Sequence, residues 1–154
     1  MKALIVYDSM FENTATIARA IGGALSADVQ HVRDANPSTA GALDLLVVGS
    51  PTHGGRATPA IDVYLKAIPN GALKHVRVAA FDTRIPAAER ALPLRTLMGI
   101  IGYAAPKIAR NLRSKGGELM APPAGFFVDD KEGPLRPGEI ERASAWLQQL
   151  VEVG

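Results

Sequence analysis

Short apolar runs alternate with longer amphipathic stretches along the whole chain. Ala3–Tyr7 is apolar at every position, and Leu43–Val48 is interrupted only by Asp44. Continuous runs of this length, rich in β-branched residues, predict strands that are buried on both faces, as in a parallel sheet. Further strands are predicted at Val29–Val32 and Val76–Phe81, and a last one in two halves, Glu118–Met120 and Gly125–Val128, around Pro122-Pro123.

The segments between these strands predict helices. Ile17, Ala18, Ile21 and Leu25 recur at helical spacing, and Asn13 or Thr14 can cap that helix. The other helices are predicted at Thr58–Ile68 with Thr58 as cap and Pro59 in the first turn, at Tyr103–Lys115, and at Glu139–Val151 with Ile140, Ala143, Trp146, Leu147 and Leu150 on its apolar side.

Pro86–Leu97 holds two prolines among good helix formers, which predicts a broken excursion with short helical pieces. The wider segment Pro86–Ala105 is rich in leucine and isoleucine. We expect it to pack on the domain as a helix; a lid over a ligand or a partner contact is the alternative.

The strand–helix alternation predicts one α/β domain over residues 1–154, with a parallel sheet covered on both faces. Ligands of such sheets bind beyond the carboxyl ends of the strands. The loops after the first, third and fourth strands are Ser9–Thr14, Ser50–Gly55 and Asp82–Ile85. All three contain small or hydroxyl residues, so the ligand site is expected there.

The first loop has the residues of a phosphate site. A turn from a strand into a helix supplies backbone N–H groups and the positive end of the helix dipole. Ser9 and Thr14 add hydroxyls, and Asn13 adds an amide. The loop lacks the lysine of a Walker loop and the glycines of a dinucleotide fingerprint. A simple helix cap made by Asn13 or Thr14 remains an equal alternative at this point.

Two of these loops resemble those of the flavodoxin-like family. The stretch Tyr7-Asp8-Ser9-Met10-Phe11-Glu12-Asn13-Thr14 resembles the flavodoxin phosphate loop, and Gly49-Ser50-Pro51-Thr52-His53-Gly54-Gly55 is similar to the second flavodoxin loop. Asp82-Thr83-Arg84 lies where the third flavin loop begins. The resemblance implies a three-layer sandwich with a five-stranded parallel sheet in the order 2-1-3-4-5.

The resemblance also implies an electron-transfer protein that binds FMN and meets redox partner proteins, a reductase and an acceptor. A cytoplasmic protein is expected on other grounds, because the apolar run Ala3–Tyr7 is too short for a signal-peptide core. Three groups of residues are then expected to bind the cofactor. They are Ser9, Met10, Phe11, Glu12, Asn13 and Thr14 at the phosphate, Pro51, Thr52, His53 and Gly54 on one side of the ring, and Asp82, Thr83 and Arg84 on the other.

Two departures from the family pattern keep other functions open. Glu12 stands where the family usually has glycine, which places a carboxylate near the phosphate and predicts a backbone angle suited to glycine. Ring-flanking aromatic residues are missing except for His53. The alternatives are a binding module that has lost the flavin and a small FMN-dependent oxidoreductase with a substrate pocket shaped by Pro86–Ala105.

Composition excludes several kinds of chemistry. The sequence has no cysteine, so a disulfide scaffold, a thiol nucleophile and a cysteine-held metal or iron–sulfur centre are excluded. The histidines His31, His53 and His75 share no ligand spacing, so no metal site is expected. His31 and His75 flank strands and are expected to be exposed. Ser50 lacks the second glycine of a nucleophile elbow, so no catalytic residue is predicted.

Charge is uneven along a chain whose net charge is only +2. Between Lys74 and Lys115, nine Lys and Arg residues face only Asp82 and Glu89, whereas three basic and seven acidic residues follow Gly116. We interpret the basic segment as a solvated helix face; a surface for anionic ligands or acidic partners is the alternative. Phe81 and Tyr103 are the only aromatic residues between Lys74 and Lys115, too few to interleave with these charges, so nucleic-acid binding is not expected. No apolar stretch reaches the length of a membrane helix.

Overall fold

The predicted strands form a single parallel sheet in the computed structural model, which describes residues 1–86 and 102–153. The strands are β1 (Ala3–Tyr7), β2 (Asp28–His31), β3 (Leu45–Pro51), β4 (Arg77–Arg84), β5 (Glu118–Leu119) and β6 (Ala124–Phe127). The order is β2-β1-β3-β4-β5, and β6 also pairs with β4. This confirms the predicted order, and it confirms that the last strand consists of two halves.

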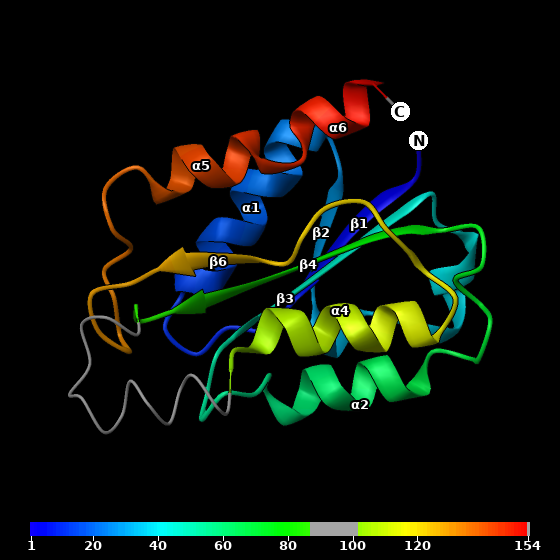
Figure 1. Cartoon of the computed structure of the whole chain (residues 1–154), viewed down its shortest axis with the longest axis horizontal. Coiled ribbons are helices and arrows are strands. Elements are labelled where there is room, and N and C mark those ends of the chain that lie inside the picture. The colour runs from blue at the N-terminus through cyan, green and yellow to red at the C-terminus, as the bar shows by residue number, and fades with distance from the viewer. Residues whose placement is uncertain (87–101, 154) are drawn as a thin grey trace.

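Helices cover both faces of the sheet, as predicted (Figure 1). The described helices are α1 (Asn13–Leu25), α2 (Pro59–Ala67), α4 (Ala104–Ser114), α5 (Glu139–Trp146) and α6 (Gln148–Val153), with short 3-10 turns η1 (Val32–Asp34) and η2 (Pro37–Ala42) after β2. Figure 1 shows α1, α5 and α6 on one face and α2 and α4 on the other.

The alternation of side chains along β4 divides the core between the two faces. Val78 and Ala80 pack into the cluster beneath α2 and α4, whereas Ala79 and Phe81 pack into the cluster beneath α1 and α5. The Phe81 ring meets Trp146 edge-on at 6.2 Å between centroids. This contact confirms that Trp146 belongs to the core.

The last predicted helix is divided in two. It ends at Trp146 and restarts at Gln148, so the predicted apolar face does not continue through its whole length. Ala143 and Leu147 are buried, but Ile140 and Leu150 are 44% and 42% exposed. The single helix that was predicted is therefore two helices, and Leu150 lies in the second of them.

The predicted caps had different outcomes. The Thr58 hydroxyl accepts the Ile61 N–H at 3.4 Å, so this cap is confirmed. Asn13 and Thr14 do not cap α1, because both already lie inside it. The capping position is Glu12, which has a left-handed φ of 68° and makes no side-chain capping bond.

β4 is longer than its apolar run. Asp82, Thr83 and Arg84 were predicted to lie in a loop, but they are the last three residues of the strand. Pairing on both sides extends the strand. Asp82 and Thr83 pair with Ser50 and Pro51 of β3 on one side and with Gly125 and Phe126 of β6 on the other. Most of the predicted Pro86–Ala105 excursion, residues 87–101, lies outside the described residues.

Candidate functional site

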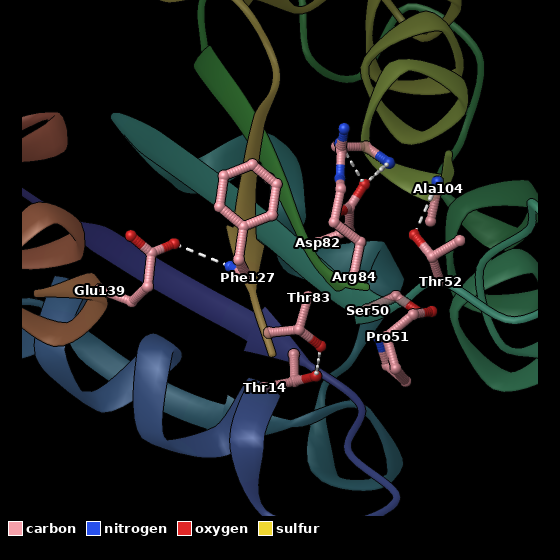
Figure 2. A network of polar contacts seen from close by, with 12 residues as sticks. Thr14, Ser50, Pro51, Thr52, Asp82, Thr83, Arg84, Ala104, Phe127 and Glu139 are labelled. Carbon is pink, nitrogen blue, oxygen red and sulfur yellow. Dashed lines mark hydrogen bonds and ion pairs between the residues drawn. The ribbon is translucent and has the colours of Figure 1, made fainter. Parts of the chain in front are cut away.

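A cleft of about 340 Å³ opens at the carboxyl ends of the central strands. It lies between the start of α1, the loop after β3, the end of β4 and the loop after β6, which is where ligands of such sheets bind. Its lining residues are Met10, Phe11, Asn13, Thr14, Pro51, Thr52, His53, Gly54, Thr83, Arg84, Ile85, Val128, Asp130 and Lys131. Figure 2 shows the polar contacts around it.

Ten of the thirteen predicted ligand residues line this cleft. The other three are Ser9, Glu12 and Asp82, whose side chains serve the local structure instead. Sequence reasoning missed Val128, Asp130 and Lys131, which follow β6. β6 is parallel to the other strands and ends at the same edge of the sheet. The loop after β6 could therefore be expected at the site for the same reason as the first three loops.

The start of α1 offers free backbone donors to the cleft. The N–H of Thr16 donates to the Glu12 carbonyl, and the N–H of Ala15 donates to the Ser9 hydroxyl at 3.4 Å. Within the described part of the chain, the N–H groups of Asn13 and Thr14 have no hydrogen-bond acceptor. Two free donors at the positive end of a helix are the features of an anion site.

Glu12 turns its carboxylate away from these donors. Its side chain is 78% exposed and meets Arg19, further along α1, at 3.1 Å. The left-handed backbone anticipated from the glycine place in the motif is therefore present, while the negative charge is directed toward solvent and a cation.

A pair of hydroxyls joins α1 to β4 inside the cleft. The Thr14 and Thr83 hydroxyls lie 2.8 Å apart, and both residues are almost fully buried (Figure 2). This bond fixes the first loop against the central sheet. Thr14 was predicted to donate to a phosphate; in the structure its hydroxyl links α1 to β4.

The base of the first loop is held by Asp8 and His31. The Asp8 carboxylate accepts the Ser9 N–H at 2.8 Å and lies 3.2 Å from His31 Nε2. His31 Nδ1 accepts the Arg33 N–H, so Nε2 is the nitrogen that carries the proton toward Asp8. His31 was predicted to be exposed, but its side chain is only 21% exposed, because it packs edge-on against Tyr7 on the adjacent strand.

The end of β4 carries a buried ion pair. Asp82 is fully buried and accepts two bonds of 2.7 Å from Arg84, together with the Ala105 N–H at 2.9 Å (Figure 2). Burial raises the pKa of the Asp82 carboxyl, while the Arg84 guanidinium and the Ala105 N–H act in the opposite direction. Arg84 Cζ also stacks 3.7 Å from the centre of the Tyr103 ring, and it lies over the Gly125 backbone, where a Cβ would overlap it.

Hydrogen bonds of Ser50 and Thr52 hold the second loop in place. The buried Ser50 hydroxyl accepts the Thr58 N–H at 3.0 Å and donates to the Pro51 carbonyl at 2.9 Å, which is a structural role. The Thr52 hydroxyl accepts the Ala104 N–H at 3.1 Å, so the loop is also tied to the start of α4. These bonds present the backbone from Pro51 to Gly54 to the cleft.

No protein-family model matches the sequence, and no curated protein matches it. Solved structures do match the fold over nearly the whole chain. Oxidised flavodoxin 2 from Bacillus cereus superimposes with a TM-score of 0.75 at 22% identity, covering 100% of both chains. A flavodoxin from the domain Archaea gives 0.73 at 20% identity, covering 99% of this chain and 98% of that one. A WrbA-like flavodoxin from Agrobacterium tumefaciens gives 0.72 at 14% identity, covering 99% of this chain and 96% of that one.

The chain has the flavodoxin fold. The predicted strand order, the strand–helix alternation and the two loop motifs all agree with this result. Within the flavodoxin fold, the cleft described above lies among the first loop, the second loop and the end of β4, the three places that the sequence motifs indicated.

Among the described residues, no helix has both the length and the apolar composition of a membrane span. In residues 1–86 and 102–153, no group of three or more His, Asp or Glu side chains is arranged to hold a metal ion.

Glu12→Gly is expected to stabilise this flavodoxin fold by about 1 kcal/mol, because glycine adopts the left-handed region without the steric cost of a Cβ. Urea unfolding measures the change. Glu12→Gln is the control, since it removes the charge and keeps the left-handed Cβ. Equal stability changes in the two variants would show that the backbone angle of Glu12 carries no cost.

A second expected result concerns Glu139, which supports the cleft wall after β6. Its carboxylate accepts the Phe127 N–H at 2.7 Å (Figure 2). It also accepts two bonds from Arg142. Burial acts to raise the pKa of Glu139, but the bonds from Arg142 and Phe127 outweigh it and hold that pKa below the ordinary 4.5. The unfolded chain therefore binds a proton at a higher pH than the folded chain does.

This linkage gives stability that is fully present above the unfolded pKa and is lost as pH falls through the depressed folded pKa. Glu139→Gln is expected to lower the free energy of unfolding at pH 7 by about 2 kcal/mol, the usual range for bonds to a charged group. The deficit should shrink below the ordinary pKa of 4.5, where wild type loses the same contribution. Urea titrations across that range measure it, and a deficit independent of pH would contradict the assignment.

Proposed function

We propose that this protein binds FMN in the cleft and carries electrons between partner proteins. The observation that carries the proposal is the convergence of the start of α1, the Pro51–Gly54 backbone and the end of β4 on one cleft. The fold supports it, since the solved structures that it resembles include several flavodoxins.

The residues of the cleft fit a phosphate at the start of α1. The Asn13 and Thr14 N–H groups have no acceptor among the described residues, and the helix dipole favours an anion at this end. Lys131 adds a positive charge to the lining, next to the carboxylate of Asp130. Since Glu12 points toward Arg19 and solvent, its carboxylate does not occupy the place that the phosphate needs.

The remaining lining fits a flat ring system between two loops. Pro51–Gly54 would hold one side, and Thr83, Arg84 and Ile85 the other. When bound, FMN would supply the one- and two-electron chemistry. The chain's own part is to bind and orient the cofactor: the Thr14–Thr83 bond fixes the first loop, and the Asp82–Arg84 pair fixes the end of β4.

A binding module without flavin is the second candidate. It is favoured by the scarcity of aromatic rings, because Phe11 and His53 are the only aromatic side chains of the described residues that line the cleft. Such a protein would hold a smaller phosphorylated ligand at the start of α1 and leave the ring side of the cleft unused.

The test is to load the purified protein with FMN, remove free cofactor, and follow reduction and reoxidation by absorbance. A carrier should keep its yellow colour, accept electrons on photoreduction and pass them to an acceptor such as cytochrome c, without consuming NADPH on its own. Protein that stays colourless would overturn FMN binding. Steady turnover of NADPH and a quinone without an added reductase would instead assign a self-sufficient oxidoreductase.

A further inference from the structure

The outer face of α4 carries uncompensated positive charge. Its eleven residues include Lys107, Arg110 and Arg113 and no carboxylate. Within the described ranges, no Asp or Glu oxygen lies within 4.0 Å of these three side chains. Elsewhere on the surface, Arg19, Arg136 and Arg142 each meet a carboxylate. No carboxylate of the described residues therefore neutralises the charge of these three side chains.

A groove of about 540 Å³ runs beside this helix, at the β5 edge of the sheet. Its lining combines an apolar floor with two guanidinium groups, and includes Pro106, Ala109, Arg110, Arg113, Leu119 and Pro123. Ala109 and Leu112 hold the inner side of α4 against the core, while Arg110 and Arg113 are exposed. Arginines that flank an apolar floor are typical of protein interfaces, where their planar forks pair with carboxylates.

The basic face is continuous with the rim of the cleft. Lys107 Nζ donates to the Gly55 carbonyl at 2.6 Å, and the Ala104 N–H donates to Thr52 in the second loop. One helix thus joins the loop that borders the ligand site to the groove. A protein seated on α4 would lie beside the cleft opening.

We infer that α4 and the groove beside it form the docking surface for an acidic protein, whose carboxylates pair with Arg110 and Arg113. A nucleic acid is disfavoured, because none of the described residues that line the groove is an aromatic residue for base stacking. The inference rests on the proposed function and extends it, because it specifies the partner of the electron carrier as a protein with an acidic surface that binds to the basic surface of α4.

The experiment measures binding of a fluorescent polyglutamate peptide to the full chain without added FMN, by anisotropy at about 50 mM salt, where screening is weak. Arg110→Glu/Arg113→Glu is compared with Lys2→Glu/Arg33→Glu, which makes the same change in net charge near the opposite, β2 edge of the sheet. We expect the Arg110/Arg113 reversal to weaken binding about tenfold or more, and the control pair to weaken it no more than about twofold.

Equal loss in both double variants would reduce the effect to net charge and overturn the inference. It would also be overturned if single-stranded DNA bound more tightly than polyglutamate and lost binding through the same two arginines, since the surface would then be for nucleic acid. Arg110→Gln/Arg113→Gln should give an intermediate loss with an unchanged thermal unfolding midpoint, which separates binding from folding. Because no FMN is added, failure here leaves the cofactor proposal standing, and failure of FMN binding leaves this result standing.

Discussion

Replacing Arg84 with methionine is expected to lower the free energy of unfolding by about 3–5 kcal/mol. Methionine keeps part of the stacking on Tyr103 but removes both bonds to Asp82, whose carboxylate is fully buried. An uncompensated charge is then left in the core at the end of β4. Urea unfolding at pH 7 measures the loss.

The double variant Asp82→Asn/Arg84→Met is the matched control. The asparagine side chain would keep an oxygen for the Ala105 N–H but carry no charge, so the double variant should recover at least half of the loss. Burial already raises the pKa of Asp82. In the single variant the folded chain therefore binds a proton at a higher pH than the unfolded chain, and the deficit should shrink as pH falls. A deficit that neither the second change nor acid relieves would show that Asp82 is not the origin of the cost.

Replacing Gly49 with alanine is the second large expected effect, about 3 kcal/mol of lost stability. A Cβ at Gly49 would overlap the tip of the Phe81 ring on the neighbouring strand. The ring has little room to move, since Phe126 and Trp146 pack against it edge-on. Because Gly49 directly precedes the second loop, displacement of β3 should also disturb the cleft.

Two comparisons test the origin of this effect. Phe81→Leu shortens the ring side chain, so it should make Gly49→Ala cost less in the double variant than in wild type. Gly23→Ala places the same methyl group on the exposed side of α1, where nothing lies within 4 Å, and should be neutral or stabilise by about 0.5–1 kcal/mol. A similar cost for both alanines would contradict the proposed overlap with Phe81.

Much of the fold followed from local patterns. The buried runs before Asp8 and Gly49 indicated two central strands, and Thr58-Pro59 indicated a helix start, because in these places the local signal and the tertiary structure agree. The end of β4 could not be found in this way. Asp82 has the character of a polar loop residue, and it lies in the sheet because it pairs with β3 on one side and with β6, more than forty residues later, on the other.

The candidate site, like the fold, was predicted from the sequence only in part. The first two loops could be predicted, since each is a short motif next to a buried strand. The wall formed by Val128, Asp130 and Lys131 was missed although its strand was predicted, because these three residues form no recognisable ligand motif. The fork between Asp82 and Arg84 and the bond between Asp8 and His31 depend on side-chain geometry that no spacing rule states.

The most direct test of the central claim is a paired titration of the purified protein with FMN and with riboflavin, followed by flavin fluorescence. The two ligands share the ring and differ in the phosphate. The described cleft predicts that FMN binds with a stoichiometry of one and about a hundredfold or more tighter than riboflavin, because the Asn13 and Thr14 N–H groups at the start of α1 would receive the phosphate. Equal affinities, or no binding of FMN, would contradict the account.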